Sequence, residues 1–169
     1  MELFKHNNLL TSKFKTSGSQ EIDYLTLFYN RRVVVFSLPV PLNFYSVRHL
    51  TDFASNYSAI KNLKVDEIYA VSSNPMLIPF VNKHAPGITA LLDTNKEFVK
   101  LLNPESTHLD ELAKLWQYVV IVNNGTIEKL FSNPLKTNMP MWVYYKEIYQ
   151  YRSLGASKII DYLNTTDIS

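Results

Sequence analysis

The first long apolar run in the chain predicts a buried strand. Residues 32–38 are rich in β-branched side chains and show no helical period, and Pro39 and Pro41 then end the run. From Ser46 onward, apolar side chains recur at spacings of three and four, which predicts an amphipathic helix with one face on a sheet. These side chains are Val47, Leu50, Phe53, Ala54 and Tyr57. A strand followed directly by such a helix is typical of a βαβ unit.

The alternation of strand and helix continues along the chain. Residues 67–72 predict a second strand, and Asn74 with Pro75 would cap and begin the helix after it. Residues 88–92 predict a third strand, followed by a helix that Asp93 and Thr94 would open. Three units of this kind favour a sheet with parallel strands at its centre.

The pattern changes after residue 117. Two strand-like runs, 118–122 and 126–131, flank Asn123-Asn124-Gly125, which is a strong signal for a tight antiparallel hairpin. A short helix is predicted over residues 157–163. The whole is an α/β chain with a mixed central sheet flanked by helices, compatible with a thioredoxin-like fold. The pattern alone would also fit a flavodoxin-like sheet.

The size and net charge of the chain limit the classes of protein to which it can belong. The 169 residues suit one domain over 1–169, and 46% apolar content can fill a sizeable core. A net charge of +2 is far from the basic stripe that nucleic-acid binding requires, so no nucleic-acid partner is expected. No apolar run approaches a membrane span and the first ten residues are polar, so we expect a cytoplasmic protein with no membrane contact.

The absence of cysteine is the strongest single fact in the sequence. It removes disulfides, thiolate metal sites and all thiol chemistry from these residues. The histidines are scattered without ligand spacing, so no metal is expected and no cofactor is implied.

Six separate blocks of the sequence form a recognisable series. They are residues 24–28, 31–39, His49-Leu50 with Phe53, 65–72 with Asn74, 91–93 with Phe98, and 116–125 with Glu128-Lys129. In this order the blocks resemble peroxiredoxins of the fifth subfamily, within the alkyl hydroperoxide reductase and redoxin group. The resemblance covers roughly residues 10–132 and implies a thioredoxin-like, peroxiredoxin-type fold.

The resemblance breaks at the catalytic loop. In the family, a Thr and a Cys stand at the start of the helix, and a distant Arg on a later strand completes the site. Counting forward from Pro39 places Asn43 at the Thr position and Ser46 at the Cys position. Gln117 stands where the family has the Arg.

A second alignment of the loop remains open because the loop is one residue short. Counting back from His49 places Leu42 at the Thr position and Tyr45 at the Cys position. In either alignment the thiol and the guanidinium are both missing. Only a thiolate attacks peroxide, and a positive charge is needed to hold the thiol ionised. We therefore expect a redox-inactive relative with degenerate site positions, in a non-enzymatic binding or assembly role.

The rival hypothesis is an enzyme of another class that reuses the former peroxide pocket. Ser46, Tyr45, His49 and Gln117 would supply its polar contacts. Pro39, Arg48 and His49 are binding candidates beside the helix start, where an anion could meet helix amides. A structural role for His49 in the first helical turn is favoured over anion binding. The sequence identifies no small-molecule ligand.

Two aromatic stretches bear on assembly. Leu42, Phe44 and Tyr45 replace small polar residues of the family's loop, and peroxiredoxins of this type are expected to pair through that loop. The segment 133–152, which includes Trp142, either packs on the body or offers a surface to a partner. We expect a homodimer that uses the loop or this segment.

Overall fold

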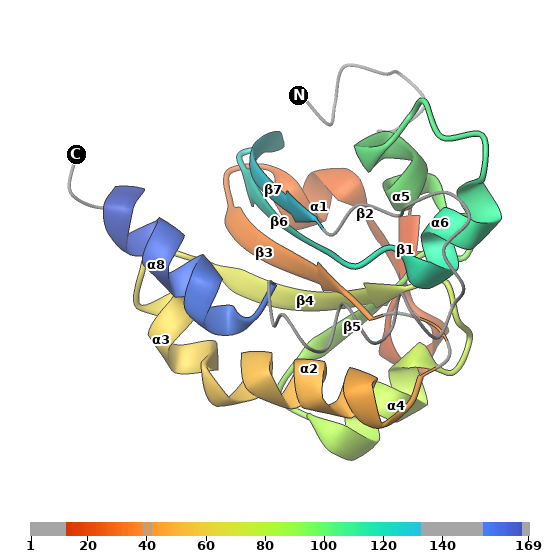
Figure 1. The fold of residues 1–169 in the computed structure, drawn as a ribbon, viewed down its shortest axis with the longest axis horizontal. Helices are drawn as coiled ribbons and strands as arrows, with labels where there is room; N and C mark the ends of the chain where they lie inside the picture. Colours follow the sequence, from red (N-terminus) through yellow and green to blue (C-terminus); the bar gives the residue numbers. More distant parts are fainter. Residues whose placement is uncertain (1–12, 39, 41, 133–153, 167–169) are drawn as a thin grey trace.

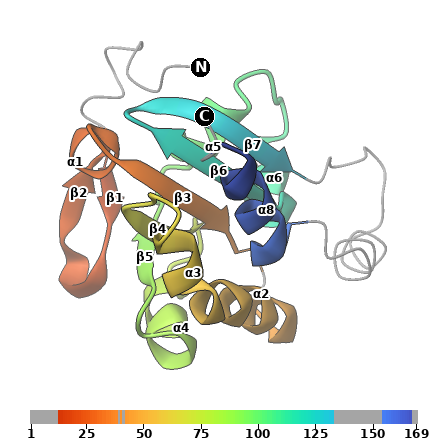
Figure 2. The same cartoon turned by 90° about the vertical axis from the view of Figure 1, so that its left-hand side faces the viewer.

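A seven-stranded mixed sheet forms the centre of the molecule, with helices on both faces (Figures 1 and 2). The computed structural model describes residues 13–38, 40, 42–132 and 154–166. The strand order is β2-β1-β5-β4-β3-β6-β7. The strands are β1 Lys13–Lys15, β2 Glu21–Asp23, β3 Arg32–Ser37, β4 Glu67–Ser72, β5 Thr89–Leu92, β6 Tyr118–Asn123 and β7 Thr126–Ser132.

The helices cover the two faces in separate groups. One face carries α2 (Phe44–Ser55), α3 (Tyr57–Lys61), α4 (Leu77–His84) and α8 (Ala156–Thr166). The other face carries α1 (Tyr24–Phe28), α5 (Glu97–Leu102) and α6 (Leu109–Leu115). A short 3-10 turn at Ser17–Ser19 connects β1 with β2.

The central strand β3 is apolar throughout because both of its faces are buried. Val34 and Phe36 pack under α2, while Val33 and Val35 belong to the core on the opposite face. β3, β4 and β5 run parallel, and β6 and β7 return antiparallel beside β3. Since only the centre of the sheet is parallel, the flavodoxin-like alternative is wrong.

The strand predictions are confirmed to within a residue or two. The three parallel strands lie where the apolar runs placed them, and the predicted hairpin is β6-β7. Its turn has positive φ at Asn124 (49°) and Gly125 (73°), as a tight type I′ turn requires. The C-terminal helix is also present and is longer than the predicted 157–163.

Two helices begin later than their predicted caps. After Asn74 the chain makes a turn, and α4 begins only at Leu77, whose N–H donates to the Asn74 carbonyl at 2.9 Å. After Asp93 a similar turn passes through Lys96 in the left-handed region (φ 58°), and α5 begins at Glu97. Asn74 Oδ1 accepts from the Met76 N–H at 2.9 Å within the turn before α4. Asp93 Oδ2 instead accepts from the N–H groups of Phe98 and Val99 in the first turn of α5 itself.

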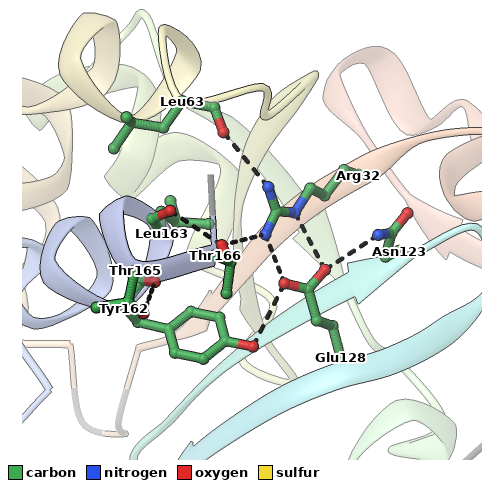
Figure 3. A network of polar contacts seen from close by, with 8 residues as sticks. All are labelled: Arg32, Leu63, Asn123, Glu128, Tyr162, Leu163, Thr165 and Thr166. Atoms are coloured by element: carbon green, nitrogen blue, oxygen red, sulfur yellow. Dashed lines mark hydrogen bonds and ion pairs between the residues drawn. The ribbon is translucent and has the colours of Figure 1, made fainter. Parts of the chain in front are cut away.

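The C-terminal helix α8 is attached to the body at both of its ends. At its start, the Ala156 N–H donates to Asp52 Oδ2 of α2 at 2.7 Å. Near its end, Arg32 donates from its guanidinium to Thr166 Oγ1 at 3.1 Å (Figure 3). The aromatic segment 133–152, which precedes α8, lies outside the described residues.

No described helix is both long enough and apolar enough to span a bilayer.

Candidate functional site

Buried polar side chains gather at one edge of the sheet. Among the described residues, five polar side chains are buried. Two end the parallel strands β3 and β4, one follows β5, one directly precedes the antiparallel β6, and one lies in the first turn of α2. They are Ser37, Ser72, Asp93, Gln117 and Ser46, in that order. This is the carboxyl edge of the parallel strands, where open α/β sheets place their ligand sites.

The start of α2 is capped by a residue of the predicted site. Asn43 Oδ1 accepts hydrogen bonds from the backbone N–H of Tyr45 at 3.0 Å and of Ser46 at 3.4 Å. These amides would otherwise lack an intrahelical partner and would attract an anion. The Asn43 side chain therefore occupies the donors that a thiolate or a bound anion would need.

The two candidates for the former cysteine position face different surroundings. Ser46 is fully buried, and it shares its helix face with the buried Leu50 and Phe53, four and seven residues later. Tyr45 is 39% exposed and Phe44 is 66% exposed. Ser46 is thus the inward residue of this turn, and its hydroxyl cannot be reached from solvent without a local rearrangement.

Gln117 lies on the same side of the sheet as α2. Val119 and Ile121 of β6 pack in the core that contains Leu50 of α2, and side chains alternate along a strand. Two residues before Val119, Gln117 continues this face at the carboxyl edge, and it is only 4% exposed. The fold therefore brings Gln117 and Ser46 to the same side of one edge, as the resemblance implies.

Ser37 has a role that the sequence did not indicate. Its Oγ accepts from the Tyr118 N–H at 2.8 Å and lies 3.2 Å from the carbonyl oxygens of Trp116 and Tyr118. The hydroxyl therefore joins the end of β3 to the start of β6. A polar residue closing an otherwise apolar run was the available signal.

The binding candidates next to α2 are not brought together. Arg48 is exposed, whereas the His49 ring packs edge-on against Phe36 at 5.5 Å and Phe53 at 5.3 Å between centroids. His49 Nε2 is buried and has no hydrogen-bond partner among the described residues. Burial lowers the pKa of His49 to about 4, and the nearby Asp52 only partly opposes this. A neutral, inward imidazole is poorly suited to hold an anion.

Pro39 lies outside the described residues. Within the described part of the chain, no group of three or more metal-ligating side chains comes together. The buried polar groups that the described residues place at this edge are three serine hydroxyls, the Gln117 amide and the Asp93 carboxyl.

Peroxiredoxins occur among both the named relatives and the solved structures that resemble this chain. The chain is 31% identical over 114 residues to a peroxiredoxin of Synechocystis sp., which covers 64% of this chain and 60% of that protein. It is 30% identical over 141 residues to the hybrid peroxiredoxin hyPrx5 of Haemophilus influenzae, which covers 77% of this chain and 58% of that protein. The chain thus spans about three fifths of the length of these curated relatives. No model of a known protein family matches the sequence.

The fold comparison gives the same result. Reduced Prx3 from Vibrio vulnificus, solved in complex with hydrogen peroxide, superposes with a TM-score of 0.71 at 21% identity, over 92% of this chain and 95% of that one. Peroxiredoxin 5 from Alvinella pompejana gives 0.60 at 19% identity, over 72% and 83%. The thioredoxin-like fold is confirmed, and the named relatives and structural neighbours reported above are peroxiredoxins.

Proposed function

We propose that this chain is a redox-inactive peroxiredoxin of the fifth-subfamily type whose role is binding or assembly. The observation that carries the proposal is the absence of any cysteine from its 169 residues. Peroxide reduction in this family forms a sulfenic acid on a thiolate, and no other side chain here can undergo that oxidation and be restored.

The surroundings of α2 support the same proposal. With Ser46 at the former cysteine position, the residue is buried and its backbone amide is already bonded to Asn43. Gln117 at the former arginine position is neutral, so it would neither lower the pKa of a thiol nor stabilise charge on a departing oxygen. The Asn43 cap and the neutral Gln117 both reduce the positive potential that peroxide chemistry requires.

The rival hypothesis, an enzyme of another class, has less support. A serine nucleophile needs a base within hydrogen-bond reach and an open approach for the substrate. Ser46 is fully buried, and His49, the nearest histidine along the chain, packs its ring against Phe36 and Phe53. A substrate would have to open the start of α2 before any reaction.

A peroxidase assay tests the loss of activity. The purified 169-residue chain, treated with a chelator, is incubated with hydrogen peroxide or an alkyl hydroperoxide and a thiol reductant, beside a cysteine-containing peroxiredoxin. We expect consumption equal to the buffer blank. Turnover above the blank that survives metal removal would overturn the proposal.

For assembly, we propose a homodimer that pairs through the exposed start of α2. Phe44 (66% exposed) and Tyr45 (39% exposed) lie edge to face, with ring centroids 5.8 Å apart. Met76, 61% exposed, directly precedes α4, which packs beside α2. Leu42 contributes less than the sequence suggested, because it packs partly on the core. In a two-fold dimer, the aromatic patch formed by Phe44 and Tyr45 would be buried on both subunits.

Light scattering tests the dimer and its location. We expect wild-type protein at micromolar concentration to be dimeric and Phe44→Asp to be monomeric. Tyr29→Asp is the matched control, since Tyr29 is also an exposed aromatic residue (56%) but follows α1 elsewhere on the molecule. A monomeric wild type ends the proposal. A dimer that survives Phe44→Asp but not Trp142→Asp would place the interface in the segment 133–152 instead.

A further inference from the structure

The turn of the β6-β7 hairpin contains the only Asn-Gly pair in the sequence. Asn124 and Gly125 make this turn between β6 and β7, both with positive φ. Asn124 is exposed. Neither the candidate site at the carboxyl edge of the parallel strands nor the exposed start of α2 includes this turn.

Two hydrogen bonds join this turn to the residues that lead into β3. The backbone N–H of Asn30 donates to Asn124 Oδ1 at 2.8 Å, and the backbone N–H of Asn124 donates to the Arg31 carbonyl at 2.8 Å. Next to them, Asn123 stands opposite Arg32 in the register of β3 with β6. The oxygen of the Asn124 amide is therefore held by a backbone donor from a distant part of the chain.

An asparagine followed by glycine can lose its side-chain amide without an enzyme. The Gly125 nitrogen, once its proton has passed to solvent, bonds to Asn124 Cγ and closes a cyclic imide. The bond from Cγ to Nδ2 breaks, and Nδ2 leaves as ammonia with a proton taken up from water. Glycine favours ring closure because it has no Cβ beside the attacking nitrogen and few forbidden backbone angles. Negative charge develops on Oδ1 during the attack, and the Asn30 N–H already donates to that atom.

Two neighbouring asparagines show what the glycine contributes. Asn30 and Asn123 are exposed too, but each is followed by a residue that has a Cβ, namely Arg31 and Asn124. The Asn123 amide nitrogen also donates to Glu128 Oε2 at 3.1 Å, which holds the group that would have to leave. Both residues should therefore keep their amides under conditions in which Asn124 reacts.

We propose that Asn124 is a deamidation site, and that its conversion to isoaspartate detaches the β6-β7 turn from the residues before β3. Water opens the imide at either carbonyl, so the whole reaction turns one amide and one water into a carboxylate and an ammonium ion. Opening at Cγ gives aspartate on an unchanged backbone. Opening at the main-chain carbonyl gives isoaspartate, whose backbone runs through Cβ and Cγ. The lengthened turn then no longer holds a side-chain oxygen against the Asn30 N–H.

Peptide mapping by mass spectrometry tests the site. The native 169-residue chain is incubated at pH 8 beside the same chain unfolded in urea, and every asparagine is scored as amide or acid. In the native chain Asn124 should convert first, at a rate within about tenfold of the unfolded chain, because an exposed turn opens at little cost. The proposal is overturned if another asparagine converts first in the native chain, or if Asn124 reacts more slowly than that range.

Amide hydrogen exchange measured by NMR tests the detachment. In the isoaspartate form, separated by chromatography, protection of the Asn30 amide should fall about tenfold, as the loss of one hydrogen bond implies, while the amides of β4 keep their protection. Asn124→Asp is the matched control, since it carries the same charge on an unchanged backbone and keeps an acceptor for the Asn30 N–H. Detachment is ruled out if the isoaspartate form protects Asn30 as well as the unreacted chain does, or if Asn124→Asp loses as much protection.

Discussion

Arg32 at the start of β3 and Glu128 on β7 form a two-point ion pair across the intervening strand β6. Arg32 Nε donates to Glu128 Oε2 at 3.1 Å, and a second guanidinium N–H donates to Oε1 (Figure 3). Both side chains are largely buried, at 13% and 18% exposed. Asn123 also donates to Glu128 at 3.1 Å, and the Tyr162 hydroxyl does so at 3.4 Å. The pair thus links the sheet edge to α8.

Removing one member of this pair should destabilise the fold. Glu128→Gln leaves a largely buried guanidinium without its counter-charge, and we expect a loss of about 2 kcal/mol in the free energy of unfolding. Glu21→Gln is the control, because the Lys13–Glu21 pair is half exposed and should change stability by less than about 0.5 kcal/mol. Urea unfolding of both variants measures the two free energies. Equal losses would show that the Arg32–Glu128 pair stabilises the fold no more than the half-exposed Lys13–Glu21 pair does.

The cap of α2 gives a second prediction. Asn43→Ala removes the acceptor for two backbone amides and should cost about 1 kcal/mol of stability. Asn43→Asp keeps the acceptor and adds a negative charge at the positive end of the helix, so it should be at least as stable as the wild type. Thermal unfolding measures both, and an Asn43→Ala variant that melts like the wild type would contradict the assignment of the cap.

Much of the fold could be predicted because the central strands are long and buried on both faces. The runs at β3, β4 and β5 have no polar alternation, so their type as buried strands could be predicted, although the pattern left a flavodoxin-like arrangement of the sheet open. The short elements β1 and β2 have three residues each, which is too few to show a period. They exist because Phe14 and Tyr24 pack on Phe98, a tertiary contact that local pattern does not contain.

The sequence could predict where along the chain the candidate site lies, but not which way its side chains point. The sequence placed the former cysteine at Tyr45 or Ser46, and only the direction of each side chain from α2 distinguishes them physically. The polar edge of the sheet had a usable signal, since Ser37, Ser72 and Asp93 each lie within one residue of the end of a predicted strand. The carboxyl ends of neighbouring parallel strands meet at one edge, so these side chains could have been grouped in advance.

His49 should make the protein sensitive to acid. Its pKa is lowered to about 4 when folded, below the usual 6.5, so the unfolded chain binds the proton more readily between these values. Stability that is present above pH 6.5 is therefore lost as the pH falls towards 4, by about 3 kcal/mol from this residue. His49→Leu should remove that dependence.

The effect of Asp93 on the pH dependence of stability must be distinguished from that of His49, because the two effects have opposite signs. Its pKa is raised to about 6 when folded, so its contribution to stability is present at low pH and is lost as the pH rises from about 4 through 6. Urea unfolding of wild type, His49→Leu and Asp93→Asn at several pH values resolves the two. A His49→Leu curve parallel to the wild type would contradict a buried neutral imidazole.

Restoring cysteine tests which residue occupies the former site and what the site now lacks. Tyr45 is 39% exposed and Ser46 is fully buried, so Tyr45→Cys should react quickly with a thiol reagent and Ser46→Cys slowly.

Ser46→Cys alone should not restore fast peroxide reduction, because Gln117 cannot provide the positive charge that ionises the thiol. The double variant Ser46→Cys with Gln117→Arg should reduce peroxide at least about tenfold faster than the single one, since a guanidinium both lowers the thiol pKa and stabilises the departing oxygen. Stopped-flow measurement of peroxide reduction compares the three variants. Equal rates for the single and double variants would remove the role given to the arginine position, and fast peroxide reduction by Tyr45→Cys would move the former cysteine position to Tyr45.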